Sequence, residues 1–329
     1  MKALIYEGPR KLAYAKSDKP VPEAHDALVR VAVAGICGSD LHGYVGEDDR
    51  RFPPLILGHE VAGVVANGKE AGRRVTINPL ITCMECEFCV SGRTNLCDLR
   101  EVLSVPPRQG GFATYVALPR GNLVTVPDDF SLSQAALVEP IACGWHAARL
   151  ARRAVPSGRR ALVIGGGAIG LGAALSLAAQ GVTSVKMYET NPLRADFLRD
   201  RCGQTVLGEP NLSEHDGFDL VIDAVGSAAS RELSSTHVRT GGVIGHIGLG
   251  ADRDALDIRR MTLQEVAFIG TYLYTAQDFR QTAAALFEGR LGPADWVETR
   301  ALSDGANAFA DLEAGRVAAP RLQLLPDPA

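Results

Sequence analysis

Short apolar segments separated by glycine and proline make up much of the first 140 residues. The segments 27–34, 61–66, 73–77 and 111–118 are brief and rich in β-branched or small residues, a pattern that favours strands over helices. We therefore expect a mainly β region, with connecting loops long enough to carry a functional site.

The pattern changes near residue 140. Continuous apolar runs at 161–165, 184–188, 219–225, 242–248 and 266–270 alternate in part with Ala- and Leu-rich stretches such as 168–180. Buried strands that alternate with helices predict a parallel sheet covered by helices. A helix-like stretch at 276–290 precedes a tail that ends in the strand-like sequence RLQLL, which we expect to return to the first region.

Composition and charge narrow the class of protein. With 329 residues, of which 46% are hydrophobic, the chain can bury the cores of two domains. A net charge of −4, with basic residues spread along the sequence, gives no field that would hold a phosphodiester backbone, so we expect no nucleic-acid partner. The first 20 residues lack the apolar run of a signal peptide, and no stretch approaches the roughly 20 apolar residues of a membrane span. We expect a cytoplasmic protein with no membrane partner.

A glycine-rich turn follows the first apolar run of the second region. Gly165, Gly167 and Gly170 have G-x-G-x-x-G spacing, directly after a predicted strand and at the start of a predicted helix. The first glycine permits a tight turn, the second lets backbone approach a pyrophosphate, and the third lets the helix pack on the strand. We expect the helix amides, around Ala168 and Ile169, to face the phosphates of a dinucleotide.

An acidic residue ends the next predicted strand. Glu189 lies about 20 residues beyond the glycine turn, where a carboxylate can accept both hydroxyls of an adenosine ribose. The same charge repels a 2′-phosphate, so the sequence favours NAD over NADP. On its own, this glutamate would be interpreted as an exposed charge at a strand end.

Four of the seven cysteines lie within 83–97: Cys83, Cys86, Cys89 and Cys97. Thiols stay free in a reducing compartment, which favours a metal site over a disulfide framework. Four thiolates close a tetrahedral zinc shell and leave no open position, so we expect this zinc to be structural. An iron–sulfur cluster is the main alternative, and thiol redox chemistry through Cys83 and Cys86 is a weaker one.

Two further motifs, AGICGSDLH at 34–42 and LGHE at 57–60, complete a pattern together with the sequence VEP at 138–140. With the cysteine segment and the glycine turn, they resemble the zinc-dependent medium-chain alcohol and polyol dehydrogenases over essentially the whole chain, and most closely the sorbitol and sugar-alcohol-phosphate branch. The resemblance implies an α/β fold with a mainly-β GroES-like catalytic domain at 1–141, a zinc lobe at 83–97, a Rossmann domain at 142–272, and a return to the catalytic domain at 273–329.

The resemblance also implies roles for individual residues. Cys37 and His59 match ligands of a catalytic zinc, and either Glu60 or Glu139 completes the shell, directly or through water. The sequence leaves these two glutamates as open alternatives.

The remaining matches concern protons and the cofactor. Asp40 matches a carboxylate that orients the metal site, Ser39 a hydroxyl that takes the substrate proton, and His42 a histidine that passes it toward solvent. Arg194 matches a basic residue beside the adenosine ribose, and Arg321 one that reaches the pyrophosphate. Helix capping is the alternative role for Ser39 and Asp40.

The expected activity is reversible oxidation of a secondary alcohol or polyol to a ketone by a zinc- and NAD-dependent oxidoreductase. A zinc aldehyde reductase or primary-alcohol enzyme is one alternative, and a catalytically silent NAD(H)-binding regulator is another. Retention of Cys37, Ser39, His42 and His59 disfavours the silent regulator. The resemblance implies a homodimer or homotetramer, whereas the substrate, its phosphorylation and the physiological direction have no readable code in the sequence.

Overall fold

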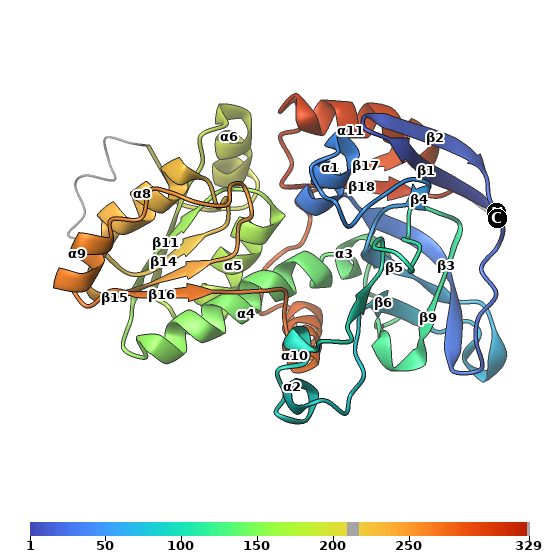
Figure 1. Cartoon of the computed structure of the whole chain (residues 1–329), viewed down its shortest axis with the longest axis horizontal. Coiled ribbons are helices and arrows are strands. Elements are labelled where there is room, and N and C mark those ends of the chain that lie inside the picture. The colour runs from blue at the N-terminus through green and yellow to red at the C-terminus, as the bar shows by residue number, and fades with distance from the viewer. Residues whose placement is uncertain (209–216, 328–329) are drawn as a thin grey trace. The chain divides into compact units, whose positions relative to one another are not determined.

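The computed structural model describes residues 1–208 and 217–327 (Figure 1). These residues form two compact units. The first unit comprises 1–139, 275–288 and 294–329, and the second comprises 140–274 and 289–293.

The first unit is built around the long strand β3 (Asp26–Gly35). This strand pairs antiparallel with β5 (Glu60–Val65), β9 (Tyr115–Pro119) and β18 (Arg321–Leu325). The seven-stranded sheet has the order β10–β6–β5–β3–β18–β17, with β9 also on β3. The other strands are β6 (Arg74–Ile77), β10 (Leu123–Thr125) and β17 (Val297–Ala301).

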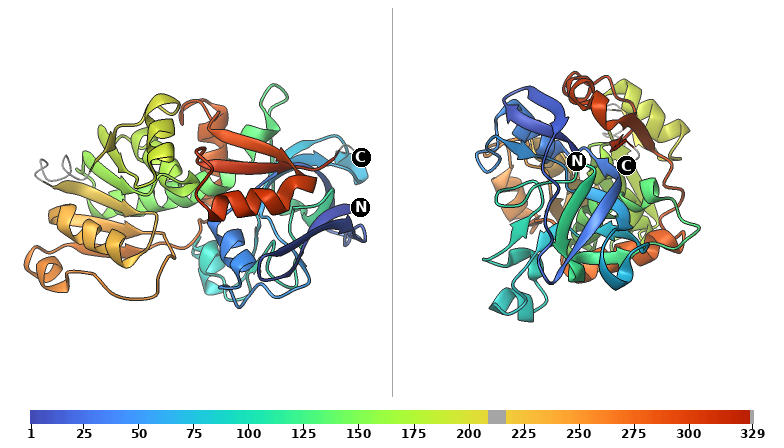
Figure 2. Two further views of the ribbon diagram at one scale, coloured as in Figure 1. Left: turned by 90° about the horizontal axis from the view of Figure 1, so that it is seen from above. Right: turned by 90° about the vertical axis from the view of Figure 1, so that its right-hand side faces the viewer.

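A second sheet carries the N-terminal hairpin. Strand β1 (Lys2–Gly8) pairs with β2 (Lys11–Lys16) and β4 (Leu55–Ile56). The Tyr14 hydroxyl donates to the Asp327 carboxylate, so the end of the described chain lies beside β2 (Figure 2). The helices of this unit include α1 (Gly38–Val45), α2 (Glu87–Val90), α3 (Leu132–Ala135), α10 (Ala276–Phe287) and α11 (Gly305–Glu313). The ring of Phe309 contacts those of Tyr44 and Phe112 in its core.

The second unit is a parallel sheet in the order β13–β12–β11–β14–β15–β16. The order in which the chain adds strands to the sheet reverses between β11 and β14, which is the doubly wound arrangement. Helices α4 and α5 lie on one face, and α8 and α9 on the other (Figure 1). A Cβ at Gly144 of α4 would lie 2.3 Å from the amide nitrogen of Ala173 in α5, so glycine allows these two helices to pack closely. The strands are β11 (Arg160–Ile164), β12 (Ser184–Tyr188), β13 (Val206–Leu207), β14 (Phe218–Asp223), β15 (Val238–His246) and β16 (Ala267–Gly270), and the helices are α4 (Val138–Ala154), α5 (Ala168–Ala179), α6 (Pro192–Asp200), α8 (Ala228–His237) and α9 (Ile258–Leu263).

The fold class predicted from the sequence is confirmed, and two strand predictions are wrong in their extent. The strand expected at 242–248 begins four residues earlier, at Val238 of β15. We expected a strand at 111–118, but β9 begins only at Tyr115. The preceding backbone is held elsewhere, because the amides of Gly110, Gly111 and Phe112 donate to the carbonyls of Ile56, Gly58 and Leu57. Among the described residues, no helix is long and apolar enough to cross a membrane.

Candidate functional site

The four-cysteine segment folds as predicted into one cluster of thiols, which we call the cysteine lobe (83–97). All four sulfur atoms lie within 4.8 Å of one another. Cys83 Sγ lies 3.9 Å from Cys89 Sγ and 3.5 Å from Cys97 Sγ, close to the edge of about 3.8 Å that a tetrahedron with Zn–S bonds of ~2.3 Å requires. This spacing fits one zinc ion and leaves no room for an iron–sulfur cluster. The antiparallel pair β7 (Leu80–Ile81) and β8 (Glu101–Val102) closes the base of the lobe.

A second group of metal-ligating side chains lies in the same unit. Ligand atoms of Cys37, His59 and Glu60 lie within 4.8 Å of one another, and we call these three residues the mixed-donor cluster. Cys37 precedes the first turn of α1, and Glu60 begins β5 opposite Gly35 of β3. A Cβ at Gly35 would lie 2.2 Å from Glu60 Oε2, so only glycine at this position lets the carboxylate fold across the end of the strand.

Asp40 ties the parts of this cluster together. Its carboxylate is fully buried and accepts the amides of Cys37 at 3.0 Å and of Gly58 at 3.1 Å. His59 Nδ1 lies 3.4 Å from Asp40 Oδ1, which leaves Nε2 as the ring nitrogen available to a metal. Burial opposes ionisation of Asp40, yet the charge of His59 holds its pKa below the usual range. Asp40 thus both caps α1 and orients the histidine.

Glu60 is a buried carboxylate that lies beside the Arg321 guanidinium but accepts no hydrogen bond among the described residues. Both of its oxygens are buried without a hydrogen-bond partner. Arg321 Nη2 lies 3.0 Å from Oε1 but outside hydrogen-bond geometry, and its Nη1 donates instead to the carbonyl of Ile36. Burial raises the pKa of Glu60 well above its usual range, and only part of this rise is offset by Arg321. A divalent ion bound by this carboxylate would offset the cost of burying oxygens that accept no hydrogen bond.

The sulfur and the imidazole of the cluster influence each other. Burial opposes ionisation of Cys37, but the hydrogen bond and charge of His59 lower the pKa of the thiol to about 7. Burial likewise disfavours the charged form of His59, whereas Asp40 and Cys37 raise its pKa well above the usual value. Thiolate, imidazole and carboxylate together form a donor set suited to zinc with an open position.

Glu139, the alternative carboxylate, is the second residue of α4 and is buried. Its charge contributes to the raised pKa of both Glu60 and Arg321. Within the described residues, Glu139 does not belong to the group of mutually close ligand atoms, whereas Glu60 does.

The predicted proton-transfer residues lie on α1. Ser39 is not the N-cap, since Cys37 has that position, and Ser39 Oγ lies 3.4 Å from Arg51 Nη2. Because a guanidinium only donates, the serine oxygen is the acceptor and its own hydrogen remains available. His42 is half-exposed, with Nδ1 3.1 Å from the Glu47 carboxylate.

Two residues beside this site had no signal in the sequence. Arg51 is buried and ion-paired with Asp48, and its Nε donates to the Ser104 carbonyl at 3.0 Å. The buried Ser104 hydroxyl lies 3.4 Å from Arg51 Nη2 and 3.3 Å from His59 Nδ1. These contacts join residues far apart in sequence, so only the fold reveals them.

In the second unit, the glycine turn lies between β11 and α5, as predicted. Gly165 has a φ of +98°, which favours glycine, and a Cβ at Gly170 would lie 1.9 Å from the carbonyl oxygen of Gly165. A Cβ at Gly167 would meet no atom within 4 Å, and no side chain caps the helix that starts at Ala168, with Ile169 next. The open space before free helix amides fits a pyrophosphate.

Glu189 reaches back to this turn from the end of β12. Its carboxylate accepts the amide of Gly166 at 2.8 Å and that of Asn191 at 2.7 Å. A carboxylate has about four acceptor positions, so two remain for ribose hydroxyls. Arg194 lies in the first turn of α6, where its amide donates to Asn191 Oδ1 at 3.3 Å.

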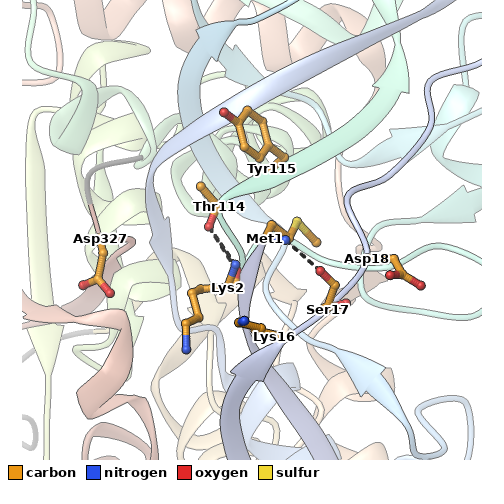
Figure 3. Close-up of a pocket in the computed structure, with 8 residues that line it drawn as sticks. All are labelled: Met1, Lys2, Lys16, Ser17, Asp18, Thr114, Tyr115 and Asp327. Carbon is orange, nitrogen blue, oxygen red and sulfur yellow. Dashed lines mark hydrogen bonds between the residues drawn. The ribbon is translucent and has the colours of Figure 1, made fainter.

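None of the three predicted sites coincides with the hollow of about 730 Å³ at the start of β1 (Figure 3). Several of its polar groups bond one another, such as the N-terminal amine to the Ser17 carbonyl at 2.7 Å and the Lys2 amide to Thr114 Oγ1 at 3.2 Å. No residue of the mixed-donor cluster, the cysteine lobe or the glycine turn lines this hollow.

Comparisons with known proteins show the family of the chain. The family model of the alcohol dehydrogenase GroES-like domain matches residues 23–128, and that of the zinc-binding dehydrogenases matches 168–288. The chain is 32% identical over 307 residues to an L-galactonate-5-dehydrogenase from Escherichia coli strain K12, covering 88% of each chain. It is 30% identical over 298 residues to a sorbitol dehydrogenase from Bacillus subtilis strain 168, covering 83% of this chain and 82% of the relative.

A solved structure shows the same architecture. A crystal structure of an Escherichia coli oxidoreductase/dehydrogenase of unknown specificity matches with a TM-score of 0.90 and 26% identity, covering 99% of each chain. The chain therefore belongs to the zinc-dependent medium-chain alcohol dehydrogenase family.

Proposed function

We propose that this chain is a zinc- and NAD-dependent dehydrogenase that reversibly converts a secondary alcohol of a polyol into a ketone. The observation that carries the proposal is the buried Glu60 carboxylate, which accepts no hydrogen bond among the described residues. One of its oxygens lies within 4.8 Å of the ligand atoms of Cys37 and His59. The names of the similar enzymes, an L-galactonate dehydrogenase and a sorbitol dehydrogenase, support a polyhydroxylated substrate.

Cys37, His59 and a carboxylate of Glu60 or Glu139 would hold the catalytic zinc. When bound, zinc supplies Lewis acidity that lowers the pKa of a substrate hydroxyl. Asp40 fixes the tautomer of His59 by its position at Nδ1. The spacing favours Glu60 as the direct third ligand, with Glu139 acting through its charge.

Ser39 and His42 provide the route for the substrate proton. The Ser39 oxygen, held as an acceptor by Arg51, takes this proton as it passes on its own hydrogen. His42 is the half-exposed group on the same helix that returns a proton to solvent. Neither residue belongs to the donor set, so both act on the proton alone.

The glycine turn, Glu189, Arg194 and Arg321 are the residues we assign to the cofactor. NAD, when bound, supplies the hydride acceptor. Free amides at the start of α5 bind its pyrophosphate, and the two remaining acceptor positions of Glu189 bind the adenosine ribose. Arg321 is buried, with Nη1 donating to the Ile36 carbonyl and Nη2 beside Glu60, so only the family resemblance supports its role at the pyrophosphate.

We also infer a homodimer or homotetramer, which the family resemblance supports, and a cytoplasmic location. The location rests on the free thiols of the cysteine lobe, since a reducing compartment keeps such thiols available to metal. Light scattering coupled to size-exclusion chromatography measures the oligomeric state.

A substrate panel tests the activity. Purified protein with zinc is assayed with NAD and a series of polyols, sugar acids, sugar phosphates, simple secondary alcohols and primary alcohols, following the absorbance of reduced nicotinamide. Turnover of polyols or sugar acids supports the proposal. Turnover of primary alcohols alone, or none with any substrate despite two zinc ions per chain, contradicts it.

The Glu189→Ser variant tests the cofactor assignment. Hydrogen bonds to a charged acceptor contribute about 1.5–3 kcal/mol, which corresponds to roughly 10- to 100-fold in the ratio of kcat/KM for NAD over NADP. We expect this ratio to fall by that factor, because the variant loses both the acceptor and the repulsion of a 2′-phosphate. A wild-type enzyme that already prefers NADP would show that Glu189 does not control the pocket.

A further inference from the structure

Arg231 of α8 lies buried at the carboxyl ends of two strands, and the guanidinium binds only backbone carbonyls among its observed partners. Nη1 donates to the carbonyls of Gly226 at 2.9 Å and Ala251 at 3.0 Å. Nε donates to the backbone carbonyl of Asp254 at 2.8 Å, and Nη2 donates to the backbone carbonyl of Arg253. Four donor contacts of a guanidinium that has five N–H groups are thus directed at backbone. The side chain of Arg231 is therefore a cross-link between chain segments.

The cross-link joins the turn that follows β14 to the segment that follows β15. Gly226 belongs to the first, and the other three carbonyls belong to the second, the segment 248–255. Backbone bonds connect the same two parts, from the Gly250 amide to the Val225 carbonyl at 3.1 Å and from the Ala251 amide to the Gly226 carbonyl at 2.8 Å. A Cβ at Gly248 would lie 2.1 Å from the carbonyl carbon of Val225, so the two segments are in direct backbone contact.

The segment holds a conformation that it would not keep alone. Asp254 and Ala255 have φ values of 75° and 70°, which L residues rarely adopt. Such backbone persists only where surrounding contacts determine it. The contacts here include the Arg231 bonds to the carbonyls of Arg253 and Asp254.

The other side of this cross-link faces the dinucleotide turn. Asp223 fixes the turn after β14 by accepting the amides of Val225 at 2.9 Å and Gly226 at 2.8 Å. A Cβ at Gly165 would lie 2.7 Å from Val225 Cγ2, so this turn packs directly against the first glycine of the fingerprint. Ligands of doubly wound sheets bind at the carboxyl ends of the strands where the order reverses, here between β11 and β14.

We propose that Arg231 is a positioning residue for the dinucleotide, because it fixes the segment 248–255 as a wall of the cofactor site before the cofactor binds. The inference rests on the NAD site proposed above. Its physical basis is preorganisation: a wall that is already ordered adds no ordering cost to binding. The positive charge itself is taken up by carbonyl oxygens, so Arg231 acts through the backbone and not by contact with the phosphates.

Arg260 provides a matched control in the same unit. Its Nε donates to the Ser235 carbonyl at 2.8 Å and its Nη2 to the Val238 carbonyl at 3.0 Å. These bonds also join an arginine to backbone, but they lie at the amino end of β15. Arg260→Ala therefore removes a similar kind of bond at the edge of the sheet away from the proposed cofactor site.

The experiment compares the zinc-loaded wild type with Arg231→Ala, Arg231→Lys and Arg260→Ala. The dissociation constant for NADH is measured by fluorescence titration, and trypsin cleavage after Arg253 is followed by mass spectrometry. For Arg231→Ala we expect about a tenfold rise in the dissociation constant, faster cleavage after Arg253 that NADH suppresses, and a kcat at saturating NAD within about twofold of wild type. For Arg260→Ala we expect a lower Tm with an unchanged dissociation constant.

Arg231→Lys keeps the charge but not the planar fork, so we expect an intermediate constant, roughly threefold above wild type. If Arg231→Ala does not fold, this variant decides the question, and an unchanged constant in it overturns the proposal. An equal rise in Arg231→Ala and Arg260→Ala also overturns it, because that result indicates a general loss of stability. A wild type that binds no NADH contradicts the proposed function instead.

Discussion

The cysteine lobe and the mixed-donor cluster are the two proposed metal sites of the first unit, and their ligands are held in place in different ways. The lobe takes four identical ligands from 83–97. Its own backbone supports them: the amides of Glu85 and Cys86 lower the pKa of the Cys83 thiol to about 7. Burial instead raises the pKa of the Cys89 thiol to about 12. A metal bound by all four sulfur atoms would keep each of them ionised, so this difference in pKa would disappear.

The mixed-donor cluster depends on side chains that are distant in sequence. Asp40, Arg51, Ser104 and Arg321 surround three unlike ligands, and all four are buried. The ligands of the lobe thus come from one short segment, whereas those of the cluster are held by buried side chains from several parts of the fold. This difference predicts that the two metals can be removed separately and with different consequences.

The largest expected effect separates the two sites by mutation. Cys37→Ala should abolish turnover and reduce bound zinc from two ions to one per chain, while NADH binding and Tm stay near wild type, because buried side chains hold the cluster together. Cys97→Ala should instead lower Tm strongly, because structural metal binding is coupled to folding. Atomic absorption, NADH titration and thermal unfolding measure these outcomes.

Chelation gives a test of the same difference without mutation. We expect a chelator to remove the zinc of the mixed-donor cluster first, with loss of activity in a folded protein, and the lobe zinc only on unfolding. Iron in the wild type, or a single zinc ion that neither variant loses, would contradict the assignment of both sites.

A smaller effect is expected from Ser39→Ala, which leaves both metal sites intact. Ser39 Oγ touches Arg51 Nη2 but no ligand of the cluster. We expect kcat to fall by roughly 10²- to 10⁴-fold, the range for a positioned proton-transfer group, with zinc content and Tm unchanged. The matched control Ser91→Ala removes a hydroxyl of the lobe that donates to the Phe88 carbonyl at 3.2 Å. Equal kinetics in the two variants would leave Ser39 without a role in proton transfer.

The same contrast explains what the sequence could predict. The lobe and the glycine turn were predictable because all of their defining residues lie within one short stretch of sequence, Cys83 to Cys97 for the lobe and Gly165 to Gly170 for the turn. The parallel sheet was also predictable, since its strands are continuous apolar runs. The predicted start of β9 was wrong because the backbone amides of residues 110–112 bond to the carbonyls of residues 56–58 and not to β3.

The remaining features arise only from tertiary contacts. The sequence shows an arginine at 51 and a serine at 104, but their meeting beside His59 follows from the fold. The sequence does not distinguish Gly35 from the other glycines, because its close contact with the Glu60 side chain is visible only in the structure. Glu60 and Glu139 were equal alternatives in sequence, and their different distances from Cys37 and His59 became visible only in three dimensions.

The smallest effect we expect is from Ser104→Ala, and it tests directly whether remote buried groups support the mixed-donor cluster. The variant removes the hydroxyl 3.3 Å from His59 Nδ1 but keeps the Ser104 carbonyl that accepts Arg51 Nε. Ser104 has a φ of 66°, and since serine and alanine both carry a Cβ, the backbone strain stays the same. Asp40 still lies 3.4 Å from His59 Nδ1, so orientation of the ring is weakened and not lost.

Loss of such outer contacts typically lowers metal affinity by about 10- to 100-fold, and we expect the Ser104→Ala variant to lie at the lower end of this range. Competition with a chromophoric chelator measures zinc affinity at each site, and the lobe of the same protein is the internal control. An equal loss of affinity at the lobe would mean that the variant destabilises the whole unit, and the proposed difference between the two sites would then be wrong.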